Sequence, residues 1–414
     1  MQDNGKKPSF GDAIKFRING KDLSGRFISS DGELAVIKLD SGYNISVPLD
    51  EIDIGEIRSN ESRKEVEYND TFGTGDKKIL MLHTGGTIAS RVDYLTGAVS
   101  PVRDIGFLRP GLRGLEKSIT VQSRIIGNIL SENMTPQDWI NISNEIWKEI
   151  HNYDGIIVTH GTDTMTYTGS ALSFMFEKLS VPIILTGSQR SSDRPSSDSF
   201  LNIGAAIRAA LEDIGEVCIS MHSDLSDESI NIIRAVRARK MHTSRRNAIR
   251  SMGSGIVANV SGDHLTMHEH LSRNKESILK NKLEKRASLY YFSPVSDPEE
   301  LISTLRDKKI AVIMATGLGH VAERIIGPIR ELSESGVRVI ITSQTINGMV
   351  DLDVYSTGRK MKSAGAISAQ RILPEVALVK AMWVHANYPE SEFSERFQEN
   401  MRGENPGREI IEGS

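Results

Sequence analysis

Apolar and polar residues alternate along the first part of the chain. Ile14, Phe16 and Ile18 are each separated by one polar residue, and the run 45–49 shows a similar alternation. Glycines interrupt these runs at intervals typical of turns, and no helical period is present. The pattern predicts a small antiparallel β-barrel over residues 1–58.

Beyond residue 76, short apolar runs alternate with helical patterns. Strands are expected at 78–83, 155–160, 181–186, 216–221, 309–315 and 337–343. Helices are expected at 163–179, 200–213 and 320–335. This alternation predicts an α/β fold of parallel sheets that are covered by helices on both faces. Asp163 would begin the first helix, where free amides and the helix dipole favour a carboxylate.

Changes in composition suggest where the domains end. We predict a linker or capping strand at 59–76, a larger α/β domain at 77–287, a smaller α/β domain at 288–385 and a tail at 386–414. The tail is polar, but Phe393, Phe397 and Met401 recur every four residues in it. This spacing predicts one short amphipathic helix that docks on a domain or a partner.

Composition excludes several classes of protein. The 414 residues are 38% hydrophobic and 25% charged, which fits a soluble globular protein with more than one core. The formal net charge of −4 gives no general reason for nucleic-acid affinity. Cys218 is the only cysteine, so we expect it in the core. The first residues lack an apolar signal segment, and no apolar run reaches about 20 residues, so we expect a cytoplasmic protein without membrane contact.

Polar side chains follow two of the predicted strands. Thr87 comes shortly after the strand at 78–83, and Thr162 and Asp163 come just after the next strand. Ligands of open α/β sheets bind beyond the carboxyl ends of the strands, so these loops can share a pocket. Two hydroxyls and a carboxylate, together with the ammonium of Lys240, suggest covalent acyl transfer without a metal.

A threonine nucleophile needs a base or a cationic environment. His83 and His160 lie near strand ends, where histidines are more often packed than catalytic. Lys240 lies among seven lysines and arginines between 231 and 250, a run without acids. The run is either a solvated positive surface or a setting in which surrounding cations allow Lys240 to accept a proton.

Further residues are candidates for the pocket wall. Ser131 and Glu132 follow an apolar run and can bind an amino-acid head group, or they can precede a helix as its cap. Ser188 follows the strand at 181–186, where backbone amides can stabilise an oxyanion. Tyr94 is either a lid residue or an exposed side chain. A metal is not expected, because the cluster at 268–270 lacks helical metal-ligand spacing.

Two motifs resemble those of a known family. Thr84-Gly85-Gly86-Thr87-Ile88-Ala89 and His160-Gly161-Thr162-Asp163-Thr164-Met165 are similar to the paired signatures of the bacterial-type L-asparaginase/glutaminase family. The resemblance runs from about Lys77 to Val384. The N-terminal barrel and the segment 354–359 resemble the branch formed by the D subunits of archaeal glutamyl-tRNA(Gln) amidotransferases.

The resemblance implies a role for each candidate residue. Thr87 corresponds to the attacking threonine, Thr162 to the second active threonine and Lys240 to the lysine paired with it. Asp163 corresponds to the carboxylate that holds the substrate amino group. The pair Ser131 and Glu132 matches the head-group pair, although free-standing enzymes usually carry glutamine at the second position. Tyr94 corresponds to the lid tyrosine but lies closer to Thr87 than is usual.

The resemblance also implies an assembly. In it, this type of chain hydrolyses glutamine, and an E subunit uses ATP and Mg to amidate the glutamate of Glu-tRNA(Gln). The chain itself would bind no cofactor, and it would form a homodimer and, with its partner, a heterotetramer. Two alternatives stay open, namely a free-standing L-asparaginase and a non-enzymatic tRNA-binding scaffold subunit that uses the basic run.

Overall fold

The computed structural model describes residues 8, 12–18, 20–30, 34–39, 44–58, 69–85, 90–92, 99–101, 115, 117–190 and 196–407. The chain divides into two compact units. The smaller unit holds the described residues up to Arg58 and the hairpin of β8 (Ser90–Val92) and β9 (Val99–Pro101). All other described residues, from Asn69 onward, belong to the larger unit.

The N-terminal unit is a five-stranded antiparallel sheet, as the alternating pattern predicts. Its strands are β1 (Ala13–Ile18), β2 (Lys21–Ser30), β3 (Leu34–Leu39), β4 (Asn44–Pro48) and β5 (Asp53–Arg58), and their order is β4-β3-β2-β1-β5. Ile14 and Phe16 project from β1 into a small core with Phe27, Ile37 and Val47. A turn of 3-10 helix, η1 (Leu49–Glu51), joins β4 to β5.

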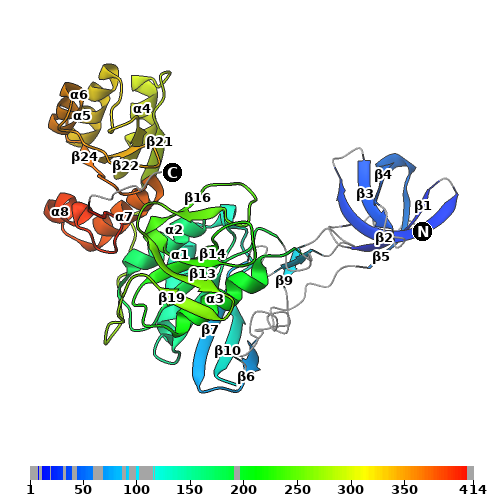
Figure 1. Cartoon of the computed structure of the whole chain (residues 1–414). Coiled ribbons are helices and arrows are strands. Elements are labelled where there is room, and N and C mark those ends of the chain that lie inside the picture. The colour runs from blue at the N-terminus through cyan, green and yellow to red at the C-terminus, as the bar shows by residue number, and fades with distance from the viewer. Residues whose placement is uncertain are drawn as a thin grey trace. The chain divides into compact units, whose positions relative to one another are not determined.

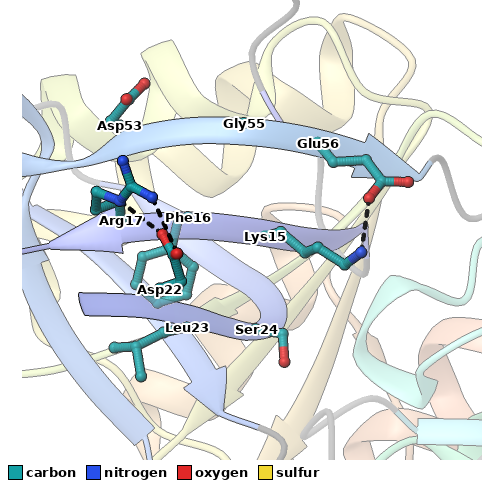
Figure 2. Close-up of a pocket in the computed structure, with 9 residues that line it drawn as sticks. All are labelled: Lys15, Phe16, Arg17, Asp22, Leu23, Ser24, Asp53, Gly55 and Glu56. Atoms are coloured by element: carbon teal, nitrogen blue, oxygen red, sulfur yellow. Dashed lines mark hydrogen bonds and ion pairs between the residues drawn. The ribbon is translucent and has the colours of Figure 1, made fainter. Parts of the chain in front are cut away.

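The opposite side of this sheet carries charged side chains. A hollow of about 530 Å³ lies over β1, β2 and β5 (Figure 2). Both of its cations are neutralised, because Lys15 pairs with Glu56 at 3.0 Å and Arg17 pairs with Asp22 at 2.6 Å, and Asp53 adds a further carboxylate. This surface therefore offers no uncompensated positive field to a phosphate backbone.

The larger unit is built around a nine-stranded mixed sheet (Figure 1). The strands, in spatial order, are β19 (His264–Met267), β18 (Ile256–Ser261), β15 (Ile230–Arg234), β14 (Val217–His222), β13 (Ile183–Thr186), β11 (Gly155–Thr159), β7 (Lys77–His83), β10 (Ile119–Ile125) and β6 (Asn69–Gly73). The five strands from β14 to β10 are parallel. The strands outside them are antiparallel to their inner neighbours.

Helices cover both faces of this sheet, as predicted. Alternate residues of β7 enter different cores: Ile79 and Met81 pack with α3 (Ser199–Leu211), whereas Leu80 and Leu82 pack with α1 (Pro136–Glu149) and α2 (Met165–Met175). Burial on both faces explains why the central strands are continuous apolar runs.

The structure decides one alternative and corrects two local predictions. Asn69–Gly73 pairs with β10 as strand β6, so this part of the segment 59–76 is the capping strand that the sequence allows as an alternative to a linker. The helix expected at 163–179 spans only 165–175, and the chain continues as β12 (Phe176–Lys178), which pairs with β20 (Ile278–Leu279). Asp163 therefore precedes the helix, and Thr164 takes the N-cap position.

The smaller α/β region contains a parallel four-stranded sheet. Its order is β21 (Ala287–Tyr291), β22 (Ile310–Ala315), β23 (Arg338–Ser343) and β24 (Ile367–Ser368). The helices α4 (Pro298–Leu305), α5 (Ile326–Glu334) and α6 (Ser356–Ser363) pack on one face. The helices α7 (Pro374–Asn387) and α8 (Phe393–Gln398) cover the other face, where α7 also contacts α2 (Figure 1).

The predicted amphipathic helix in the tail is confirmed. Phe393 and Phe397 of α8 are buried, and Met401 packs beside them in the core that α7 shares with α2. The tail therefore docks within its own chain. Among the described residues, no helix has both the length and the apolarity that crossing a membrane requires.

Candidate active site

Three strand ends meet at one edge of the large sheet. Strand β11 lies between β7 and β13, and Thr159 pairs in register with His83 on one side and with Thr186 on the other. Beyond the strands, the Thr84 amide and hydroxyl both donate to the Thr159 carbonyl, at 3.2 and 2.9 Å. The loops that follow β7, β11 and β13 therefore begin side by side, as their place in the sequence predicts.

The ammonium of Lys240 joins two residues of the second motif. Its Nζ donates to Thr162 Oγ1 at 2.9 Å and to Asp163 Oδ1 at 2.8 Å. Lys240 comes from β16 (Ala238–Lys240), which pairs with β17 (Ile249–Ser251). The Lys240 side chain is only 14% exposed, so water screens its contacts with Thr162 and Asp163 less than at an open surface.

Ser131 joins the same cluster from a third element. It begins the 3-10 turn η4 (Ser131–Asn133), and its hydroxyl lies 3.5 Å from Asp163 Oδ2. The Thr164 hydroxyl holds this turn by donating to the Ser131 carbonyl at 2.6 Å. Sequence reasoning did not find Thr164, whose signal is its place inside the second motif. Glu132, on the same turn, is exposed.

Two glycines allow the loops to approach so closely. A Cβ at Gly161 would lie 2.7 Å from both the Cβ and the hydroxyl of Ser131. A Cβ at Gly187 would lie 2.6 Å from the His160 carbonyl and 3.1 Å from the Thr162 methyl. These distances leave no room for a side chain, so glycine is required at both positions.

Ser188 is also near this cluster, because it follows Gly187 directly. It is 4% exposed, and no group in the described part of the chain pairs with its hydroxyl. Thr87 and Tyr94, the remaining predicted site residues, lie outside the described residues. The structure therefore brings together Thr162, Asp163, Lys240 and Ser131.

The two candidate histidines are packed beneath the loops. His83 bridges the Thr159 and Ser123 hydroxyls at 2.8 and 2.7 Å, and burial lowers its pKa to about 4. His160 contacts the Gly161 carbonyl at 2.7 Å and the Thr168 hydroxyl at 2.8 Å, and burial likewise lowers its pKa to about 4. Both rings are neutral near pH 7, in accord with the packed interpretation.

The basic run at 231–250 is not a solvated positive surface. Five of its seven cations turn inward to separate acceptors. Arg234 pairs with Glu269 at 2.7 Å, Arg237 binds the Met252 carbonyl, Arg239 lies 3.7 Å from Glu375, Lys240 binds Asp163, and Arg246 pairs with Asp227. Only Arg245 and Arg250 are exposed. This arrangement removes the observation that motivated a tRNA-binding scaffold.

Two family models match the chain over both α/β regions. The Asparaginase, N-terminal model matches residues 78–273, and the Glutaminase/Asparaginase C-terminal domain model matches residues 288–397. The L-asparaginase of Thermococcus kodakarensis superposes with a TM-score of 0.74 and 29% identity, covering 80% of this chain and all of that one. L-asparaginase I of Vibrio cholerae superposes with a TM-score of 0.68 and 27% identity over 79% of this chain and 98% of that one. The fold is thus that of the asparaginase class.

Relatives that also cover the N-terminal unit are more similar in sequence. The glutamyl-tRNA(Gln) amidotransferase D subunit of Thermoplasma volcanium is 45% identical over 92% of this chain and 94% of its own length. The corresponding D subunit of Thermoplasma acidophilum is 43% identical over 95% of this chain and 96% of its own length. The chain belongs to the family of glutamyl-tRNA(Gln) amidotransferase D subunits.

Proposed function

We propose that this chain hydrolyses glutamine and supplies the ammonia to a partner, the E subunit of an amidotransferase that converts Glu-tRNA(Gln) to Gln-tRNA(Gln). The observation that carries the proposal is the position of Lys240, whose ammonium contacts both the Thr162 hydroxyl and the Asp163 carboxylate. This contact provides the proton relay that amide hydrolysis by a threonine needs. The family of the chain supports the choice of reaction.

The proposed reaction has two steps. The Thr87 hydroxyl attacks the side-chain amide carbon of glutamine, an ester bond forms, and the C–N bond breaks. The hydroxyl proton passes through Lys240 to the leaving nitrogen, which departs as ammonia. Water then attacks the ester, releases glutamate and returns a proton to Thr87. Backbone amides near Thr162 and Ser188 stabilise the oxyanion in both steps.

The remaining polar residues bind the amino-acid part of the substrate. Asp163 is 65% exposed and presents a carboxylate to the α-ammonium group, and the Ser131 hydroxyl approaches its second oxygen. Glu132 extends this surface, and Tyr94 acts as a lid. A charged pair at an amino-acid head group fixes the orientation of the side-chain amide toward the nucleophile.

The assembly follows from the same proposal. The E subunit binds ATP and Mg and performs the amidation, and this chain binds neither. The chain forms a homodimer and, with two E subunits, a heterotetramer. Ammonia production is slow in the isolated chain, because gating by the partner avoids loss of glutamine.

Substitutions of Lys240 and Thr162, with an exposed arginine of the Lys240 segment as the control, test the site. Lys240→Met and Thr162→Val should each reduce ammonia release from glutamine by at least about 10³-fold, because proton transfer and nucleophile activation are lost together. Arg245→Met removes a charge five residues away at an exposed position and should leave the rate within about twofold. Full activity in either of the first two variants would remove that residue from the mechanism.

A free-standing L-asparaginase is the second candidate, because the L-asparaginase of Thermococcus kodakarensis superposes on most of the larger unit. Rates on asparagine and glutamine, with and without the E subunit and Glu-tRNA(Gln), separate the two functions. The amidotransferase role predicts glutamine hydrolysis that rises at least about tenfold in the complete assembly. Fast asparagine hydrolysis that the partner leaves unchanged would favour the second candidate.

A further inference from the structure

A buried polar network lies behind the loop that follows β13. The Asp198 carboxylate is fully buried and accepts the backbone N–H groups of Gln189 and Arg190 at 3.0 to 3.1 Å. One side chain therefore holds two consecutive amides of the loop that begins with Gly187 and Ser188. A buried carboxylate that accepts several amides is a rigid anchor, because its bonds are charge-assisted.

Asn202 of α3 connects this anchor to the Gly187 peptide. Its Nδ2 donates to the Gly187 carbonyl at 2.9 Å and to Asp198 Oδ2 at 3.2 Å. Both partners only accept hydrogen bonds, so the amide nitrogen must face the loop. The amide oxygen then faces His222, whose Nδ1 lies 2.7 Å away. His222 must donate from Nδ1, and this bond fixes the orientation of Asn202.

The orientation of one peptide follows from these bonds. In a trans peptide, the carbonyl and the next N–H point in opposite directions. Since the Gly187 carbonyl faces Asn202, the Ser188 N–H points away from α3, and no backbone carbonyl among the described residues accepts it. Asn202 thus leaves the Ser188 amide available on the face of the peptide that does not meet α3.

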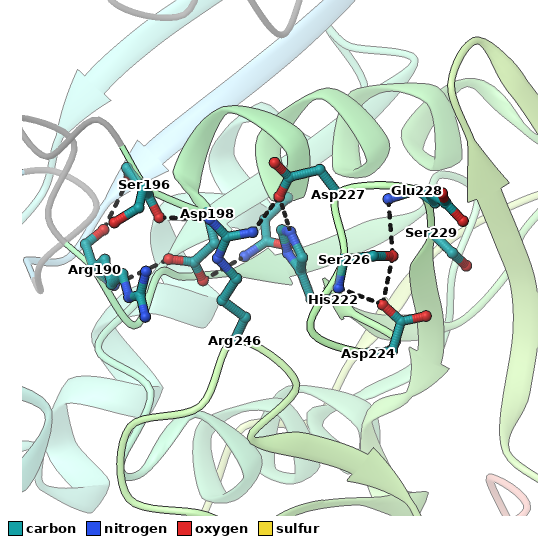
Figure 3. A network of polar contacts seen from close by, with 12 residues as sticks. Arg190, Ser196, Asp198, His222, Asp224, Ser226, Asp227, Glu228, Ser229 and Arg246 are labelled. Carbon is teal, nitrogen blue, oxygen red and sulfur yellow. Dashed lines mark hydrogen bonds and ion pairs between the residues drawn. The ribbon is translucent and has the colours of Figure 1, made fainter.

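An arginine side chain holds the far end of the same loop. Arg246 donates to the Ser196 carbonyl at 2.9 Å and pairs with Asp227, whose Oδ1 lies 3.6 Å from His222 Nε2 (Figure 3). Arg246 lies in the loop that follows Lys240. A hydrogen bond from the Met241 amide to the Ala248 carbonyl, at 2.6 Å, closes this loop. The network therefore ties the loop after β13 to the segment of the proton-relay lysine.

We propose that Asn202 and Asp198, with His222 as their support, are positioning residues that aim the Ser188 amide at the developing oxyanion. The proposal rests on the proposed amidohydrolase function. Ser188 would act directly on the substrate, and the three buried residues would act only through it. A donor aimed in advance costs no reorganisation during the reaction, so losing its aim lowers the turnover rate more than substrate affinity.

Asn202→Leu tests the positioning role with a side chain of similar volume. On glutamine, the full-length variant should show a kcat lower by about 30- to 300-fold, as expected for a misaimed oxyanion donor, and a KM within about threefold. Amide hydrogen exchange at Ser188 to Arg190 should accelerate, because the Gly187 carbonyl loses its donor. An unchanged kcat, or a fall in kcat/KM that comes only from a higher KM, would overturn the proposal.

Ser220→Ala is the matched control. Ser220 is equally buried, and its hydroxyl donates to the backbone carbonyl of Asn202 at 2.9 Å and not to the loop. This variant should lose some thermal stability and keep kcat within about twofold. An equal loss of kcat in Ser220→Ala would show that any disturbance of α3 has the same effect, which would also overturn the proposal.

A second pair keeps the test decisive if Asn202→Leu does not fold. The amide nitrogen of asparagine can replace Nδ1 of a histidine, so His222→Asn should retain kcat within about threefold. His222→Leu removes the donor and should lower kcat at least about tenfold. Equal kcat values in the two variants would contradict a role for this hydrogen bond.

The Lys240 and Thr162 variants separate the two proposals. If Lys240→Met and Thr162→Val abolish ammonia release while Asn202→Leu keeps its kcat, only the positioning role fails. If both of the first variants remain fully active, the proposed site itself is wrong, and the results for Asn202 concern packing alone.

Discussion

The contacts of Lys240 show that a run of charged residues in the sequence does not predict the direction of each side chain. Its ammonium meets Thr162 and Asp163, which lie 78 and 77 positions away in the chain. The neighbouring Arg239 and Arg237 face other acceptors, a buried glutamate and backbone carbonyls. The sequence shows seven cations between residues 231 and 250, whereas the direction of each one depends on the element packed against it.

The close contacts around Ser131 belong to the same scale. The sequence suggests that Ser131 binds a head group, and the structure places its hydroxyl against Asp163. The contact depends on Gly161, because any side chain there would meet Ser131 first. The spacing of residues in the sequence cannot show this requirement for glycine, because the distance between the two loops sets it.

His160 provides a residue-scale prediction for stability. Burial lowers its pKa from 6.5 to about 4. Between these two pH values, His160 is therefore protonated in the unfolded chain and neutral in the folded chain. Its contribution to folding is fully present above pH 6.5 and is lost as the pH falls toward 4. The shift corresponds to about 3 kcal/mol.

The variant His160→Asn isolates this effect, because asparagine does not titrate and can still donate to the Gly161 carbonyl. Urea unfolding at pH 7 and pH 4.5 should show that the wild-type chain loses about 2 to 3 kcal/mol more than the variant on acidification. Parallel losses in the two proteins would mean that His160 titrates normally in the folded state.

At the scale of elements, the central strands were the easiest to predict. They are buried on both faces, so each is a short continuous apolar run, and the six predicted strands all form. The antiparallel strands β18 and β19 were missed, because they lie next to and at an edge of the sheet, where more positions are exposed and the pattern is weaker. Helix α1 was also missed, although Thr135 and Asp138 form a capping box at its start.

Helix α7 escaped prediction for a different reason. It lies between the small sheet and α2, and most of its side chains are buried, including Lys380 and Trp383. A helix covered on several sides lacks the polar stripe by which amphipathic helices are recognised. Its place in the fold is therefore decided by its neighbours.

A buried ion pair joins α7 to the tail and provides the element-scale prediction. Lys380 and Glu404 form a salt bridge and are both fully buried, and Glu404 also accepts the Arg402 amide at 2.7 Å. Glu404→Ala should cost about 3 to 5 kcal/mol of folding free energy, because it leaves the Lys380 ammonium buried with the Glu399 carbonyl but without a counter-ion.

The double variant Lys380→Met/Glu404→Gln should cost less than Glu404→Ala, because no unpaired charge remains. Urea unfolding of the two single variants Lys380→Met and Glu404→Gln and of the double variant measures the coupling, which should exceed about 1 kcal/mol. Additive costs would show that the two charges do not stabilise each other in the folded protein.

On the scale of the whole molecule, the chain contains two units with separate cores. Among the described residues, the N-terminal core holds six buried apolar side chains, far fewer than the cores of the larger unit. Small cores of this kind give marginal stability. We therefore expect two unfolding transitions rather than one.

Calorimetry with one core substitution in each unit checks this expectation. Phe16→Ala should lower only the transition of the N-terminal unit, and Ile79→Ala only that of the larger unit, since each removes a side chain from one core. A single transition that both substitutions shift equally would mean that the units unfold cooperatively.

The sequence by itself determined the barrel-like N-terminal sheet, six of the parallel strands and the two motifs with their polar residues. These features depend on local patterns, since burial on one or both faces of an element leaves its period in the chain. The motifs were also sufficient to suggest the family.

Only the tertiary structure decided which polar side chains meet. The pairing of Lys240 with Thr162 and Asp163, the inward turn of the basic run and the Asp198–Asn202–His222 network each join residues from different elements. Such contacts depend on how helices and loops pack across the sheet, and the direction of a side chain over that distance leaves no periodic trace in the sequence.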